Sequence, residues 1–248
     1  MTYYKFLMND GVPRYGTGKW FLPTDTEPGE WMPIVKDIKL CESGYHFCAN
    51  SNQLRRWIAP KCYEIEIRGE VLHDDDKSVA QEARLVREFT PWNERTMRLF
   101  ACDCAERVLR IYEGRRPNDK RVRGCIEAAR DYANGKIQIE ALRETRDAAA
   151  AAANAADYPA AAAAAYPAAA AAYAAAAAAA YAAAYAAAAD ADADAAYAAA
   201  YAAAAYDAAY AAAAYAAAAD ADADAAARQE EKDWQNQRIL QYLNGEVV

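Results

Sequence analysis

The residues best suited to bind a metal ion lie in one short stretch near the N-terminus. Cys41, His46 and Cys48 supply two thiols and an imidazole, and Cys62 follows closely enough to act as a fourth ligand. Thiolate and imidazole are the ligands of structural zinc sites. Because Cys-x4-His-x-Cys is not a common zinc pattern, these residues are weak candidates. We expect a reduced turn in which His46 bonds the backbone, and we predict no metal and no cofactor.

Acid–base catalysis has few candidate residues in this chain. His46 and His73 are its only histidines. The carboxylates near them in the sequence are Glu64, Glu66, Asp74, Asp75, Asp76 and Glu82. A hydrolytic site needs a nucleophile, a base and a group that orients the base. Spacing alone assembles no such set, so we predict no catalytic residue and favour a protein that is not an enzyme.

A cluster of basic residues could bind an acidic protein surface. It consists of Arg115, Arg116, Lys120, Arg121 and Arg123, which we place in a turn between two helices. Such a cluster is either a solvated turn or a docking site, for an Asp triplet of the Ala-rich region or for an acidic partner, whose affinity falls as salt is added. Arg115, Arg116 and Arg121 are therefore partner-binding candidates.

The first 90 residues must position the cysteine–histidine stretch, and their pattern predicts a small α+β module. Turn signals such as Asn9-Asp10-Gly11 separate short runs of large apolar residues. Ser51 is the expected N-cap of a short helix. Cys62–Arg68 alternates with the period of a strand, and Val79–Val86 predicts a second strand.

The next part of the chain changes to the helical spacing of apolar residues. This spacing predicts one helix from about Asn93 to Glu113, with Cys104 on its apolar stripe and Cys102 near the opposite face. Asn118 is the expected N-cap of a second helix, and Gly135 suits its C-terminal cap. Two antiparallel helices would hold the basic cluster between them.

Residues 148–227 consist almost wholly of three residue types, with 59 alanines, ten tyrosines and eight aspartates. Alanine has the highest helix propensity, so the whole stretch is predicted to be helical. An identical decamer occurs at Tyr185–Asp194 and at Tyr215–Asp224, which indicates an internal repeat. The Asp triplet in each copy favours helix ends and predicts a bundle or stacked array of helices. A single long rod is the alternative.

Tyrosines of this stretch are the second set of partner-binding candidates. Tyr197, Tyr201, Tyr206 and Tyr210 are spaced by four and five residues, which places them on two sides of a helix. Tyrosine is enriched at protein interfaces. The final segment, residues 228–248, again has large apolar residues and is expected to cap the array.

Charge and composition exclude several classes of protein. The net charge is −8, and residues 148–227 contain no Lys or Arg, which argues against binding of nucleic-acid phosphates. Aspartates interrupt the alanine stretch, which argues against a transmembrane helix. The N-terminus lacks a basic region followed by an apolar run. We therefore expect a cytoplasmic protein with six reduced cysteines.

Three sequence blocks in the first 90 residues carry a family resemblance. They are Leu40–Cys48 (LCESGYHFC), Tyr63–Val71 (YEIEIRGEV) and Asp75–Val79 (DDKSV). In this order they resemble a small domain of unknown function that is common in phage and bacterial proteins. The resemblance implies no activity.

The rest of the chain resembles a bacterial family labelled as immunity proteins. The blocks that carry this resemblance are Trp92–Arg95 (WNER), Ala101–Leu109 (ACDCAERVL), Pro117–Arg121 (PNDKR) and Ile126–Arg130 (IEAAR), followed by an Ala-rich tail that ends near Trp234. The label reflects a role in neutralising partner toxins of polymorphic toxin systems. It implies binding of a protein and not catalysis.

Together these features predict the fold class α+β. A small N-terminal α+β module, residues 1–90, is followed by a mainly α-helical, Ala-rich bundle or stacked-helix array, residues 91–248. The leading hypothesis is a non-enzymatic bacterial or phage accessory protein that binds a toxin or a defence component. One alternative is a protein that sequesters or processes a nucleotide-like ligand through Gly44–Cys48, Trp20 and Trp31. The other is a structural protein that self-assembles, and the sequence leaves homo-oligomerisation open.

Overall fold

The computed structural model describes residues 2–115, 117–138, 140–142, 144–145, 148 and 221–247. Within these ranges, only the backbone is described for residues 94, 108, 110–112, 114–115 and 221–228. The chain divides into two compact units. The first consists of Met1–Asn93 together with Asn236–Val248, and the second of Glu94–Gln235. The two ends of the sequence therefore belong to the same unit.

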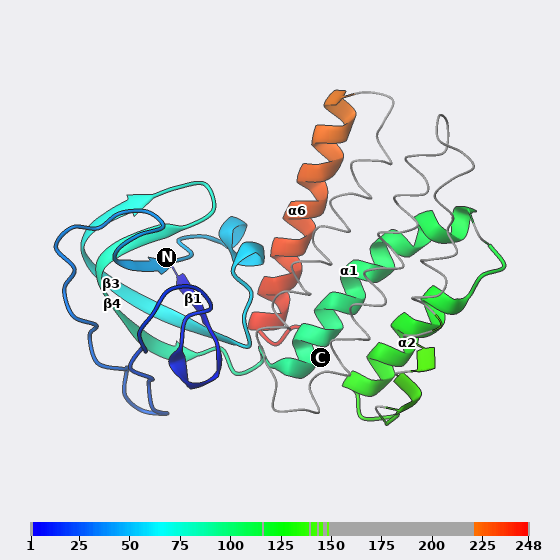
Figure 1. Ribbon diagram of the computed structural model, residues 1–248, viewed down its shortest axis with the longest axis horizontal. Helices are drawn as coiled ribbons and strands as arrows, with labels where there is room; N and C mark the ends of the chain where they lie inside the picture. The colour runs from blue at the N-terminus through cyan, green and yellow to red at the C-terminus, as the bar shows by residue number, and fades with distance from the viewer. Residues whose placement is uncertain are drawn as a thin grey trace. The chain divides into compact units, whose positions relative to one another are not determined.

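The first unit contains a four-stranded antiparallel sheet. Its strands are β1 (Tyr3–Leu7), β2 (Tyr45–Phe47), β3 (Lys61–His73) and β4 (Ser78–Glu88), in the order β1-β3-β4-β2 (Figure 1). The two predicted strands correspond to β3 and β4, which extend beyond the predicted bounds. The predicted α+β module is thereby confirmed.

The sheet curls until its two edges meet. Register shifts in the β3–β4 pair between Glu64 and Ile65 and between Arg68 and Val71 mark bulges, which bend strands and increase their twist. At the edges, the Tyr4 N–H donates to the Cys48 carbonyl at 2.9 Å, and the Cys48 N–H donates to the Tyr4 carbonyl at 2.8 Å. β1 and the end of β2 are thus joined, and a closed sheet leaves few unpaired edges.

The core of the first unit lies on the inner face of this curled sheet. Its buried members are Leu7, Trp20, Phe47, Ala49, Tyr63, Ile65, Ala80, Ala83 and Leu85. On β3, Tyr63 and Ile65 are buried, whereas Glu64 and Glu66 form ion pairs with Arg87 and Arg84 of β4. This alternation is the period of two that a strand with one buried face requires.

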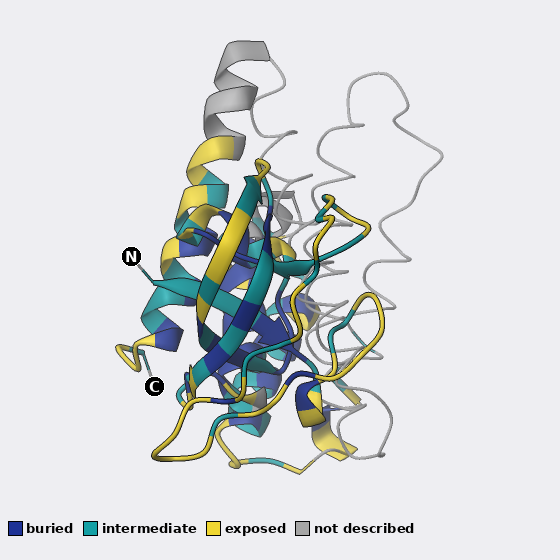
Figure 2. Ribbon diagram, turned by 90° about the vertical axis from the view of Figure 1, so that its left-hand side faces the viewer, coloured by how far each residue is buried: buried dark blue, intermediate teal, exposed yellow. Residues whose placement is uncertain are grey.

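A long connecting segment, residues 8–44, joins β1 to β2 and contains one 3-10 helix, Asn9–Gly11. The N–H groups of Gly29, Met32 and Val35 donate to the carbonyls of Leu85, Ala83 and Gln81, each at 2.9 Å. The segment thereby pairs with the part of β4 that extends beyond its short pairing with β2. Figure 2 shows that much of the loop structure joined to the sheet is exposed.

The short helix predicted after Ser51 is a 3-10 helix, Ser51–Arg56. The expected N-cap was wrong by one residue. Asn50 is the N-cap, and its side chain accepts the N–H of Asn52 at 3.0 Å. Asn and Ser cap helices about equally well, so residue type alone could not show whether Asn50 or Ser51 is the N-cap.

The second unit contains α1 (Glu94–Arg115) and α2 (Arg121–Ala133). The expected N-cap Asn118 is wrong, because α2 follows Lys120, and the Asp119 carboxylate accepts the Arg121 N–H at 3.2 Å. Gly135 follows the helix with a φ of 69°, as its predicted capping role requires. α2 buries an apolar face made of Val122, Cys125, Ile126, Ala129 and Ala133.

α1 is buried more broadly than its sequence pattern indicates. Cys104 is buried as expected, but Cys102, predicted near the opposite face, is also fully buried. Leu99 and Ala101 are buried as well. A helix buried on more than one side has neighbours on both, so the single-stripe prediction for α1 was too narrow.

The last described helix is α6 (Ala221–Leu243). The predicted bundle or array of Ala-rich helices, residues 148–227, lies almost wholly outside the described residues. In the part of the chain that the structure describes, no helix is both long enough and apolar enough to cross a membrane.

Candidate functional site

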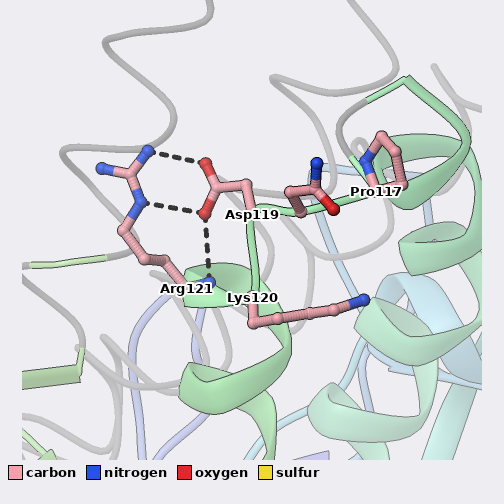
Figure 3. A pocket seen from close by; sticks show the side chains of 5 residues that line it. Pro117, Asp119, Lys120 and Arg121 are labelled. Carbon is pink, nitrogen blue, oxygen red and sulfur yellow. Dashed lines mark hydrogen bonds and ion pairs between the residues drawn. The ribbon is translucent and has the colours of Figure 1, made fainter.

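Three of the basic residues identified in the sequence, Lys120, Arg121 and Arg123, lie at the turn between α1 and α2. Pro117, Asn118, Asp119, Lys120 and Arg121 line an open pocket of about 750 Å³. Figure 3 shows the Asp119 carboxylate facing the Arg121 guanidinium, with the Lys120 side chain extending away from this pair. Arg121 donates to Asp119 from Nε at 2.9 Å and from Nη2 at 2.6 Å. Two parallel bonds hold the guanidinium in one orientation.

A second carboxylate holds the remaining described cations of this turn. Arg123 donates to Glu113 from Nε at 2.8 Å and from Nη2 at 2.6 Å, and Lys120 Nζ lies 3.4 Å from Glu113 Oε1. These partners, Arg123 first, lower the pKa of Glu113 to about 2. Glu113 is therefore ionised at neutral pH, and it links the last turns of α1 to the start of α2.

The α1–α2 turn presents oriented hydrogen-bond donors with a small excess of positive charge. Lys120, Arg121 and Arg123 carry three positive charges and Asp119 and Glu113 two negative ones, which leaves one positive charge. The side chains of Lys120 and Arg121 are 63% and 41% exposed. An arrangement of this kind can bind a carboxylate of a partner, and salt will weaken the attraction.

Sequence reasoning found the cations of this turn but missed their two carboxylates. A signal for Asp119 existed, because it stands two residues before Arg121. Glu113 precedes Arg123 by ten residues, and their pairing depends on where α1 ends. Local spacing could not show that the side chains of Glu113 and Arg123 meet.

Arg130 fixes α2 against α1 from the other end of the pair. It donates from Nη2 to Asp103 and to Glu106, each at 2.6 Å. Burial acts to lower the pKa of Arg130, but the nearby Asp103 carboxylate raises it above its ordinary value. The guanidinium stays charged, so this contact is a permanent link between the two helices.

Arg107 joins α1 to α6 within the second unit. Its Nε donates to Glu231 Oε2 at 2.7 Å, and its guanidinium lies 4.3 Å from the centre of the Trp234 ring. Glu231 in turn accepts from Gln235 at 3.2 Å. A cation bound both to a carboxylate and to an aromatic face positions these helices more firmly than a surface ion pair does.

The weak metal candidates lie in the first unit, and they differ in surroundings. Cys41 is exposed and Cys48 is buried. His46 Nε2 accepts the Cys41 backbone N–H at 2.9 Å, so this nitrogen is occupied by a hydrogen bond. Among the described residues, no group of three or more His, Cys, Asp or Glu side chains is placed to hold a metal ion.

None of the six cysteines forms a disulfide, and five of them are buried. Burial raises the pKa of Cys48 and of Cys102 to about 12, and it raises the pKa of Cys62 and Cys104 as well. Buried thiols with raised pKa values are protonated at neutral pH, and protonated thiols are poor nucleophiles. These four cysteines therefore contribute to packing and not to chemistry.

The two tryptophans proposed for ligand binding are already engaged. Trp20 is 5% exposed, and Lys5 Nζ lies 5.1 Å from the centre of its ring. Trp31 carries the guanidinium of Arg68 at 3.7 Å and that of Arg84 at 4.8 Å. Neither arrangement favours the stacking of a nucleotide base against these rings.

Several predicted site residues cannot be placed. Arg116, Tyr197, Tyr201, Tyr206 and Tyr210 lie outside the described residues, as does the side chain of Arg115. Only Arg121 of the partner-binding candidates has a described side chain, and it lies in the α1–α2 turn.

The described part of the second unit is thus helical, presents the charged α1–α2 turn and has buried thiols. Residues 75–240 match the family model described as immunity protein Imm5, and residues 22–95 match that of a domain of unknown function (DUF7666). Since the first match spans more than half of the chain, the protein belongs to the immunity protein Imm5 family. Both resemblances noted in the sequence are confirmed. No curated protein and no solved structure matches the chain.

Proposed function

We propose that this protein binds a protein toxin in the cytoplasm and neutralises it without catalysing a reaction. The observation that carries the proposal is the match of residues 75–240 to an immunity protein family. The match includes α1, the charged turn, α2 and most of α6. The thiols of the second unit are buried, which is in keeping with a binding role.

We infer that the α1–α2 turn is one contact surface for this toxin. Arg121 is held in a fixed orientation by Asp119, so little side-chain entropy is lost when a partner carboxylate binds. Arg115 and Arg116 adjoin the turn in sequence and add two positive charges. The candidates Tyr197, Tyr201, Tyr206 and Tyr210 belong to the same proposal as further contacts.

The proposal is tested with a candidate toxin domain from the genome that encodes this protein. Cells that express the active domain are expected to grow only when the full chain is co-expressed. An inactive form of the domain is expected to co-purify with the chain as a defined complex. Growth arrest in the presence of well-expressed, folded chain, with no complex in solution, would contradict the proposal.

The role of the turn is tested by reversing charge. In the double variant Arg115→Glu/Arg121→Glu we expect affinity for the inactive domain to fall by about tenfold or more and to depend less on salt. Lys136→Glu is the matched control, because Lys136 is also an exposed cation paired with a carboxylate, Asp131 at 3.0 Å. Equal affinities for the double variant and the control would exclude the turn as a contact.

A further inference from the structure

An exposed aromatic residue stands at the edge of the first unit. Tyr15 is 62% exposed and lies in the loop of residues 13–19, between β1 and β2. Gly16 and Gly18 in this loop have φ values of 87° and 99°, which favour glycine. No described atom lies within 4 Å of the position that a Cβ would take at either glycine. The described part of the chain therefore leaves this loop uncovered.

Tyr15 is nevertheless held in place by its neighbours. Its ring meets the ring of Trp57 edge to face, at 5.9 Å and 88°. The Arg14 guanidinium lies 5.1 Å from the centre of the Tyr15 ring, and Lys77 Nζ lies 5.7 Å from that of Trp57. We call Arg14, Tyr15, Trp57 and Lys77 the aromatic–cation ladder.

The inner end of the ladder is fixed by Asp76. Trp57 Nε1–H donates to the Asp76 carbonyl at 2.6 Å, and Lys77 Nζ donates to its carboxylate at 2.8 Å. Arg56 binds the same carboxylate at 2.7 Å. A hydrogen bond to Asp76 raises the pKa of Lys77, so this ammonium is charged at neutral pH. The ladder is thus rigid at Trp57 and exposed at Tyr15.

The outer end of the ladder carries positive charge that no described carboxylate neutralises. Arg14 forms no hydrogen bond and no ion pair with described residues, and its described contact is with the Tyr15 ring. Guanidinium groups that lie on an aromatic ring keep their N–H edge free for a carboxylate. Tyr, Trp and Arg are also the residues in which binding energy concentrates at protein interfaces.

We propose that the aromatic–cation ladder is a second contact surface for the neutralised protein, and that this protein presents a carboxylate beside an apolar side chain. The carboxylate would bind Arg14, and the apolar group would cover Tyr15. The inference rests on the proposed function, because the partner is the same toxin. Lys77 Nζ lies 2.8 Å from the Asp76 carboxylate and 4.0 Å from that of Asp74, so the positive charge offered to the partner is that of Arg14.

Neither family match covers the whole of the aromatic–cation ladder. The match to the domain of unknown function begins at residue 22, and the immunity family match begins at residue 75. Arg14 and Tyr15 precede both, whereas Trp57 lies inside the first match. The loop therefore adds an exposed aromatic group to a ring that the domain of unknown function supplies.

The test measures affinity of the full chain for the inactive toxin domain by calorimetry. We expect Tyr15→Ala and Arg14→Gln to weaken binding by about tenfold to a hundredfold, the range of interface hot spots. Thr17→Ala is the control, because Thr17 is exposed in the same loop. Melting temperatures should remain unchanged, since Tyr15 packs only at the surface. Hydrogen exchange of residues 13–19 and 56–57 should slow in the complex.

The outcomes separate this inference from the proposed function. If the wild-type chain binds the domain while both variants bind within about twofold of Thr17→Ala, the ladder is not a contact, and the proposed function stands. If the wild-type chain does not bind the domain, the proposed function is contradicted, and the inference that rests on it falls as well.

Discussion

Gly44 is a position at which the first unit leaves no room for a side chain. Its φ is 100°, and a Cβ there would lie 2.6 Å from Val79 Cγ2 and 2.9 Å from Ile38 Cγ2. We expect Gly44→Ala to lower the free energy of unfolding by about 2–3 kcal/mol, from backbone strain and overpacking together. Urea unfolding followed by tryptophan fluorescence measures this loss.

Gly16→Ala is the matched control for that prediction. Gly16 also has a positive φ, 87°, but nothing described lies within 4 Å of its virtual Cβ. Its substitution adds backbone strain alone and should cost about 1 kcal/mol. Equal losses for the two variants would show that the contact with Val79 does not matter.

His46 links the stability of the first unit to pH. Burial lowers the pKa of His46, and the charges of Lys5 and Lys77 lower it further, against a hydrogen bond to the Gly44 backbone that raises it. The neutral ring accepts the Cys41 N–H at 2.9 Å, which a protonated ring cannot do. Below about pH 6.5 the unfolded chain therefore binds more protons at this histidine than the folded chain.

We accordingly expect the His46 contribution to stability to be present above about pH 6.5 and to be lost as pH falls through the lower pKa of the folded state. Urea unfolding at a series of pH values from 7.5 to 5 would measure it. In His46→Gln the free energy of unfolding should fall less steeply over this range, by at most about 1.4 kcal/mol per pH unit. Parallel curves for wild type and variant would refute this linkage.

At the scale of elements, Glu113 joins α1 to α2. Its pKa is lowered to about 2, chiefly by Arg123, so its contribution is present above the ordinary carboxylate pKa near 4.5 and is lost as pH falls towards 2. We expect Glu113→Gln to cost about 0.5–1 kcal/mol at pH 7, because the pair is close to solvent. Thermal unfolding at pH 7 and pH 2.5 measures the effect, which should shrink at the lower pH.

Glu140→Gln gives the control for this prediction. Glu140 is exposed, and no ion pair is described for it. Its substitution should change stability by no more than about 0.5 kcal/mol. A comparable loss in both variants would mean that net charge, and not the Glu113–Arg123 pair, governs the junction.

The sequence predicted those elements that local periodicity defines. β3 and β4 followed from alternation, and α1 and α2 from helical spacing, with ends correct to within a few residues. β1 and the three-residue β2 carry no such pattern, because they are short and their pairing partners lie far away in the chain. For the same reason the closure between Tyr4 and Cys48, and the pairing of Glu113 with Arg123, could not be derived from spacing.

At the scale of the whole molecule, family matches and folding units do not share boundaries. The immunity family match starts at residue 75, just before β4, and ends at residue 240, whereas the first unit takes in both β4 and Asn236–Val248. The first unit is therefore made of two segments that are far apart in the sequence. Residues 1–93 therefore lack part of their own core when they are separated from the C-terminal tail.

Trp92 and Tyr242 define that missing part. Trp92 is fully buried, contacts Phe6 at 5.9 Å and Tyr242 at 6.4 Å between ring centres, and donates its Nε1–H to the Ala59 carbonyl at 2.9 Å. Tyr242 is 1% exposed. We expect Tyr242→Ala in the full chain to lower the free energy of unfolding of the first unit by about 3 kcal/mol, whereas Gln237→Ala, at an exposed position, should change little.

The same reasoning predicts the behaviour of a fragment. Residues 1–93 alone should show red-shifted tryptophan emission and a broad unfolding transition, because Trp92 loses its Tyr242 neighbour and is wetted. Joining residues 236–248 through a flexible glycine–serine linker should restore a blue-shifted spectrum and cooperative unfolding, and the same joined fragment with Tyr242→Ala should not recover. If residues 1–93 unfold cooperatively at the same denaturant concentration with and without the tail, the two ends of the chain do not form one folding unit.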